Sequence, residues 1–142
     1  MEVSQVRRRV QAALSASRER AQKRREIVAD AERTYDSFLS DVAIPLARQV
    51  ANVLKVEGRA FTVSTPGRSV RLAPDRGGDD FIEIALNTEA HPPAVLGYSR
   101  HTRGSRTIDE ERPLKPGAFP NEITEEDVLE FFMRALEPWL ER

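Results

Sequence analysis

The sequence of 142 residues predicts an α+β fold: a long N-terminal helix kinked or split near Pro45, a meander of four to five antiparallel strands, and a C-terminal helix. Three observations lead to this prediction. Apolar residues in the first third recur at the alternating three- and four-residue spacing of a helix. From Arg59 onward the spacing changes to the alternation typical of strands. The last twenty residues then combine a helix-capping sequence with a helical apolar face.

The opening segment, residues 3–56, contains no glycine and a single proline, Pro45. Proline lacks the N–H that a helix interior needs, so a kink or split is expected at residues 41–44. Apolar residues are dense only after residue 34. We therefore expect residues 1–34 to project as a basic helical arm and residues 35–142 to form one domain. The heptad-spaced positions of this helix are Leu14, Ala21, Val28, Tyr35 and Val42, with Ser17, Arg24, Ala31 and Phe38 between them.

The alternating segments predict strands at residues 60–65, 68–73, 81–86, 95–100 and 106–111. Pro66 and Gly67 suit the central positions of a type II turn between the first two. Short connections between successive strands are typical of an antiparallel meander. The candidate core residues on these strands are Phe61, Val63, Val70, Leu72, Ile82 and Ile84.

The closing helix is predicted to begin after Thr124, with Asp127 three residues on in a near capping box. Its apolar face, from Val128 to Leu140, is wider than one small sheet is expected to cover. Pro138 is expected to break its last turn. We expect this helix and residues 35–56 to cover one face of the sheet.

Composition and motifs argue against catalysis. The chain has no cysteine, which excludes disulfides and thiolate chemistry and favours a reducing, cytoplasmic location. No apolar run approaches the ~20 residues that span a membrane. His91 and His101 lack the spacing of metal ligands, and neither a serine-nucleophile motif nor a phosphate-binding glycine loop is present. The sequence therefore predicts no enzyme, no catalytic residue, no cofactor and no metal.

The net charge of −1 conceals a strong polarity along the chain. Residues 1–25 carry eight Lys/Arg and two Glu, whereas residues 109–142 carry four Lys/Arg and ten Asp/Glu. A second basic cluster, residues 100–106, suits an anion-binding turn, although charged turns more often serve solubility. The candidate contact residues are Arg7, Arg8, Arg9, Arg18, Arg20, Lys23, Arg24 and Arg25 on the arm, and Arg100, Arg103 and Arg106 on the turn.

These charges constrain how the arm could assemble. With Leu14 at heptad position a, Arg20 of one chain would face Arg25 of the other in a parallel, in-register pair. We therefore expect a homo-oligomer, first of all a dimer, that is not parallel and in register through residues 14–31. The remaining arrangements are an antiparallel pair, docking on an acidic surface such as the C-terminal region of a second copy or an acidic protein partner, and contact with nucleic acid.

The predicted function is that of a non-catalytic, intracellular, self-associating interaction or adaptor protein that uses the basic N-terminal helix as its contact element. The first alternative is a nucleic-acid-binding accessory protein that uses the same arm. The second is a small anion- or ligand-binding domain that uses the 100–106 turn. A membrane partner is not expected.

Overall fold

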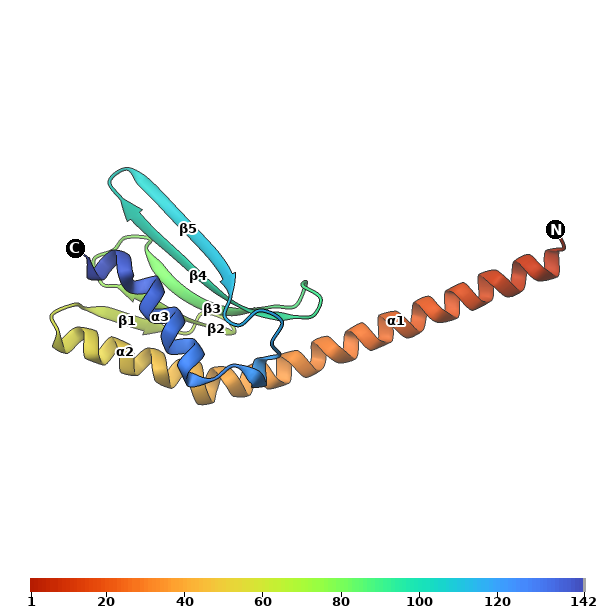
Figure 1. Ribbon diagram of the computed structural model, residues 1–142, viewed down its shortest axis with the longest axis horizontal. Coiled ribbons are helices and arrows are strands. Elements are labelled where there is room, and N and C mark those ends of the chain that lie inside the picture. The colour runs from red at the N-terminus through yellow and green to blue at the C-terminus, as the bar shows by residue number, and fades with distance from the viewer. Residues whose placement is uncertain (142) are drawn as a thin grey trace.

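The computed structural model describes residues 1–141 and confirms the α+β prediction (Figure 1). Helix α1 (Val3–Phe38) continues through a π-helical turn (Leu39–Ala43) into helix α2 (Ile44–Val56). Five strands follow, then a short 3₁₀ turn (Pro120–Glu122) and helix α3 (Glu125–Leu140). The strands are β1 (Phe61–Ser64), β2 (Ser69–Pro74), β3 (Phe81–Asn87), β4 (Ala94–Arg103) and β5 (Arg106–Pro113).

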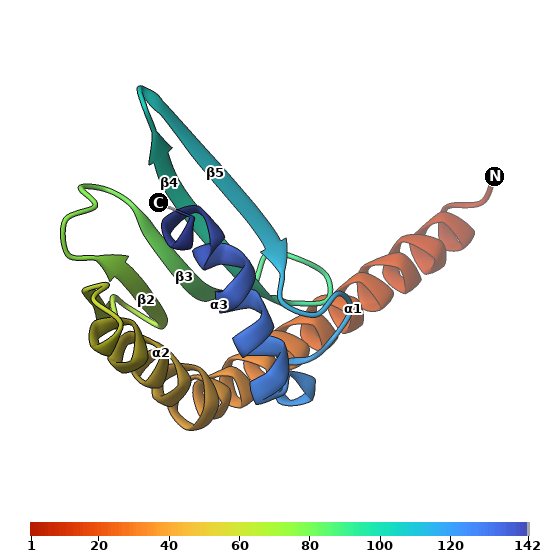
Figure 2. The same cartoon turned by 60° about the vertical axis from the view of Figure 1, so that its left-hand side comes forward.

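The first helix changes direction where the sequence predicts it (Figures 1 and 2). Pro45 has no N–H to offer the carbonyl of Asp41, and its ring crowds that carbonyl. The π-helical turn immediately before it widens the helix by one residue and takes up this misfit. Helix α2 then ends at Val56, and Gly58 follows with a φ of +83°, the left-handed conformation that commonly terminates a helix.

The five strands form one antiparallel sheet in the order β1-β2-β3-β4-β5, as a meander requires. The turn between β1 and β2 contains Gly67 at a φ of +58°. On the inner face, Val70 and Leu72 of β2 and Ile82 and Ile84 of β3 are buried.

Helices α2 and α3 pack on this inner face together (Figure 2). Phe61 and Val63 of β1 are only partly buried against the same core, because β1 is the edge strand. The hydrophobic core therefore lies between the sheet and the α2–α3 pair.

The opposite face of the sheet carries a small cluster of aromatic and charged side chains. The guanidinium carbon of Arg71 lies 3.9 Å from the ring centre of Phe81, and the rings of Phe81 and Tyr98 are 5.4 Å apart. Glu83 accepts a hydrogen bond from Arg71 at 3.2 Å. These side chains contact one another across neighbouring strands, as cross-strand pairs do.

Helix α3 begins with the predicted capping box. The backbone N–H of Asp127 donates to the Thr124 hydroxyl at 3.2 Å, and the Asp127 carboxylate accepts from the Thr124 N–H at 2.9 Å. The predicted break at Pro138 is wrong, since the helix continues to Leu140. One missing N–H is tolerated here because Trp139 is buried and its carbonyl accepts a hydrogen bond from Arg59 at 2.7 Å.

Candidate interaction site

The N-terminal part of α1 runs away from the domain as a single straight helix (Figure 1). Ala31 is the first buried residue along it. At 1.5 Å per residue, the 28 residues from Ala31 back to Val3 extend about 42 Å. We refer to residues 1–30 as the arm.

One face of the arm is apolar. Val3, Val6, Val10 and Leu14 are exposed and form an apolar stripe at the tip. Beyond Leu14 the same side of the helix carries Ala21 and Val28, interrupted by the polar residues Ser17 and Arg24. It then leads directly to the side chains of α1 that are buried in the core, which are Ala31, Tyr35 and Phe38. At 100° per residue all of these positions share one side of the helix, so the arm prolongs the core-facing side of α1 into solvent.

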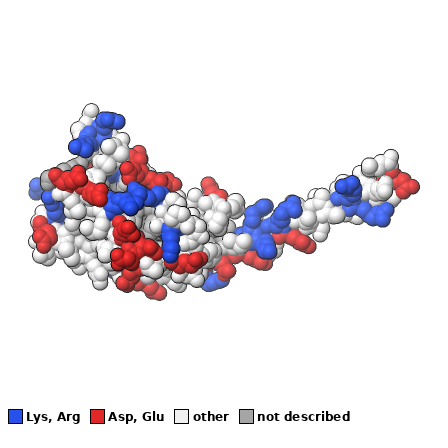
Figure 3. Space-filling model, viewed as in Figure 1, with Lys and Arg blue, Asp and Glu red and all other residues white. Residues whose placement is uncertain are grey.

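The eight predicted contact cations of the arm form two groups along it, Arg7 to Arg9 and Arg18 to Arg25 (Figure 3). All eight are exposed, and within residues 1–141 none of them forms an ion pair. The helical geometry places Arg7, Arg18 and Arg25 along one edge of the apolar stripe, and Arg9 and Arg20 along the other. The arm is therefore an amphipathic helix with basic edges.

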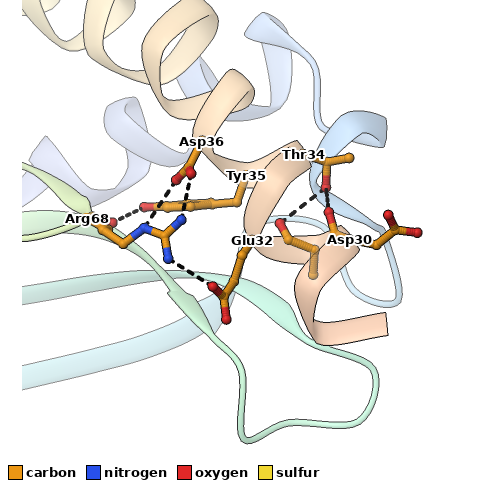
Figure 4. Close-up of polar contacts among 7 residues, drawn as sticks. Asp30, Glu32, Thr34, Tyr35, Asp36 and Arg68 are labelled. Atoms are coloured by element: carbon orange, nitrogen blue, oxygen red, sulfur yellow. Dashed lines mark hydrogen bonds and ion pairs between the residues drawn. The ribbon is translucent and has the colours of Figure 1, made fainter. Parts of the chain in front are cut away.

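A polar clamp holds the root of the arm against the turn between β1 and β2 (Figure 4). The Tyr35 hydroxyl donates to the carbonyl of Arg68 at 2.7 Å. The Arg68 guanidinium contacts Asp36 at 2.6 and 3.2 Å and Glu32 at 3.1 Å. Burial, followed by the charges of Glu83 and Asp36, raises the pKa of the Tyr35 hydroxyl, and the hydrogen bond with Asp36 is the main cause of the raised pKa of Arg68. The clamp sets the direction in which the arm leaves the domain.

The arginines of the 100–106 turn do not converge. Arg100 lies on the outer face of the sheet, where it donates to Asp109 at 2.8 Å and to the Tyr98 hydroxyl at 3.2 Å. The Tyr98 hydroxyl in turn donates to Asp109 at 2.6 Å, and the hydrogen bonds from Arg100 and Tyr98 lower the pKa of the Asp109 carboxylate. Arg103 and Arg106 pair across the tip of the β4–β5 hairpin, and strand alternation places both on the opposite face from Arg100.

Two surface hollows were not evident from the sequence. The first is a polar cleft of about 520 Å³ between the β4–β5 hairpin and α3. Its lining includes three arginines and three glutamates, so neither positive nor negative charge predominates. The ring of His101, which also lines the cleft, packs edge-on against the ring of Trp139, with 5.9 Å between the ring centres. The charged lining residues are Arg103, Glu110, Arg112, Arg134, Glu137 and Glu141.

The second hollow is an apolar groove of about 320 Å³ between α2 and α3. The apolar face of α3, which was predicted to be wider than the sheet could cover, is exposed to solvent in this groove. The side chains that define the groove are Leu46, Val50 and Val53 of α2 and Leu129, Met133 and Leu140 of α3. Neither hollow could be located from the sequence, because each joins elements that are distant along the chain.

No helix within residues 1–141 is long and apolar enough to cross a membrane. Across the same residues, no three His, Cys, Asp or Glu side chains come together in a group that could hold a metal ion. Comparison of the chain with protein-family models, with curated proteins and with solved structures finds no match.

Proposed function

We propose that this chain is a non-catalytic, self-associating interaction protein and that the arm is its contact element. One observation carries the proposal: the tip of the arm presents an exposed apolar stripe, flanked by basic residues, at a distance from its own domain. The stripe consists of Val3, Val6, Val10 and Leu14. Apolar side chains arranged contiguously on an exposed helix mark an interaction surface, whereas scattered ones do not.

Helix energetics support the same proposal. Most helical stability in proteins comes from packing of an apolar face, and the arm has no such packing in its own chain. The eight Lys/Arg and two Glu of residues 1–25 give a net charge of +6, which is equal and opposite to the −6 of the four Lys/Arg and ten Asp/Glu of residues 109–142. A second copy therefore offers both missing elements, apolar cover and opposite charge.

Light scattering of the full chain after size exclusion tests the proposal, at ~0.1 M and ~1 M salt, where the Debye length falls from ~10 Å to ~3 Å. We expect a dimer at low salt that dissociates more readily at high salt. Val10→Asp introduces a charge into the stripe and is expected to give a monomer. Ala12→Asp adds the same charge on the opposite side of the helix and serves as the matched control. A full chain that stays monomeric at low salt refutes the proposal.

Nucleic-acid binding by the same arm is a second candidate, supported by the two cation groups. Arg7 and Arg25 are 18 residues apart, about 27 Å along the helix, which suits contact with several phosphates. Against it, the arm has no aromatic side chain for stacking on bases. Fluorescence anisotropy with labelled duplex and single-stranded oligonucleotides tests it. The logarithm of the affinity must fall linearly with the logarithm of the salt concentration.

A further inference from the structure

We propose that the tip of the arm, residues 3–14, docks into the apolar groove between α2 and α3 of a second copy of this chain. The inference rests on the proposed self-association and names the surface that receives the arm. Four features support it: the exposure of the groove, its length, the charge of its rim, and the rigidity of the arm.

The groove exposes apolar side chains that its own domain leaves uncovered. Val53 has an exposed fraction of 62% and Met133 one of 48%. Their neighbours Leu54 and Leu136 are buried, so the floor of the groove is formed while its upper walls remain in contact with solvent. A third helix laid between α2 and α3 would cover these walls, in the way that amphipathic helices occupy apolar grooves.

The apolar part of the arm tip has the length of the groove. Val3 and Leu14 are eleven residues apart, a helical span of about 16 Å. Leu129 and Leu140, which mark the α3 wall of the groove, are also eleven residues apart. Aligned side by side, the two helices would bring the exposed apolar residues of the tip, Val3, Val6, Val10 and Leu14, against the groove along its whole length.

The charge of the groove rim complements the arm. At 100° per residue, four exposed acidic residues follow the outer, solvent-facing side of α3 next to the groove. Arg134 is the one basic residue of α3 (residues 125–140) and lies beside them, where it lines the polar cleft with Glu137 and Glu141. Figure 3 shows several groups of acidic side chains over the domain with basic ones between them, whereas basic side chains predominate on the arm. On α2, Arg48 and Lys55 lie on the side of the helix away from the groove. The acidic edge consists of Glu126, Glu130, Glu137 and Glu141.

The rigidity of the arm requires the groove to belong to another molecule. Residues 3–38 form one uninterrupted α-helix without glycine or proline. Leu14 is 17 residues beyond Ala31, so the tip begins about 25 Å from the point where the helix leaves the core. The clamp of Tyr35 and Arg68 fixes the exit direction. The tip therefore cannot return to its own groove while the helix is intact, and a reciprocal exchange of arms closes a two-fold dimer.

Engineered cysteines test this docking directly, because the chain has none of its own. A full chain with Leu14→Cys is mixed under mild oxidation, in separate samples, with a differently tagged full chain carrying Leu129→Cys or Leu140→Cys, the two ends of the α3 wall. We expect a disulfide-linked heterodimer as the main product of one of the two mixtures. Ala12→Cys, on the opposite side of the arm helix, replaces Leu14→Cys in the matched control and is expected to give at least ~10-fold less. Disulfides that join Leu14→Cys chains to each other would indicate an arm-to-arm pair and overturn the docking.

A second pair of variants measures the energetics by light scattering and sedimentation. Val53→Asp places a charge in the groove wall and is expected to weaken self-association by about 10-fold or more. Val56→Asp makes the same change one turn further on, at a residue with 84% exposure outside the groove, and should leave self-association unchanged. Self-association that survives Val53→Asp overturns the docking alone. A full chain that does not self-associate overturns the proposed function as well.

Discussion

The hydroxyl of Tyr35 should stabilise the protein at neutral pH and destabilise it in strong base. Tyr35 is fully buried at the root of the arm, and its hydroxyl donates to the Arg68 carbonyl at 2.7 Å. The change Tyr35→Phe keeps the ring and removes this hydrogen bond together with a longer one, of 3.4 Å, to the carbonyl of Ile84. We expect the variant to lose about 1 kcal/mol of unfolding free energy at pH 7, the usual net value of one such bond.

The sign of this difference should reverse at high pH. Burial raises the pKa of Tyr35 in the folded protein above the ordinary value near 10. Above that value the unfolded chain releases the phenolic proton while the folded chain retains it, so the stability of the wild type falls as pH rises. At pH 11, one unit above the ordinary pKa, the loss from this group is about 1.4 kcal/mol. Tyr35→Phe has no such proton, so the two stabilities should cross between pH 10 and 11.

Urea unfolding of both proteins, followed by circular dichroism from pH 7 to pH 11, measures this crossing. Other groups titrate over the same range, including Tyr98, whose pKa is also raised, but they are common to both proteins and cancel in the difference. A difference that stays constant from pH 7 to pH 11 would show that the Tyr35 hydroxyl ionises in the folded state as freely as in the unfolded one. The burial argument would then be wrong.

Four further changes probe other parts of the fold. A Cβ at Gly97 would overlap the ring of Phe131, so Gly97→Ala should cost about 1–3 kcal/mol, and a cycle with Phe131→Ala should show that most of this cost depends on the ring. Thr124→Ala removes the helix cap and should cost about 1 kcal/mol in urea unfolding at pH 7. The hydrogen bond from the backbone N–H of Thr124 lowers the pKa of Asp127 in the folded protein. The stabilisation by that carboxylate is therefore present above its unfolded pKa near 4 and is lost as the pH falls. The difference in unfolding free energy between wild type and Asp127→Asn should accordingly shrink from pH 7 to pH 3. Deletion of residues 2–24 should give the same thermal midpoint in calorimetry as the monomeric full-length Val10→Asp variant, because neither protein is stabilised by self-association. A midpoint several degrees below that of Val10→Asp would mean that the arm packs on its own domain.

The sequence was sufficient for features that depend on near neighbours along the chain. The alternation of Val70 and Leu72 marked the buried face of β2, since side chains along a strand alternate between the two faces of the sheet. The capping box of Thr124 follows from residues three apart, and the change of direction near Pro45 follows from one missing N–H. The exception was Pro138, where the buried side chain of Trp139 and the Arg59 contact outweighed the local preference of proline.

Features that join distant segments required the folded structure. The sequence predicted a wide apolar face on α3, but not that α2 would lie beside it and leave a groove between them. It predicted three arginines near one turn, but the strand register placed Arg100 on the opposite face from Arg103 and Arg106. The clamp of Tyr35, Asp36 and Arg68 spans about 30 residues, as its hydrogen bonds show. Such contacts depend on the sheet register and on the packing of the helices, and the spacing of residues along the chain carries no information about either.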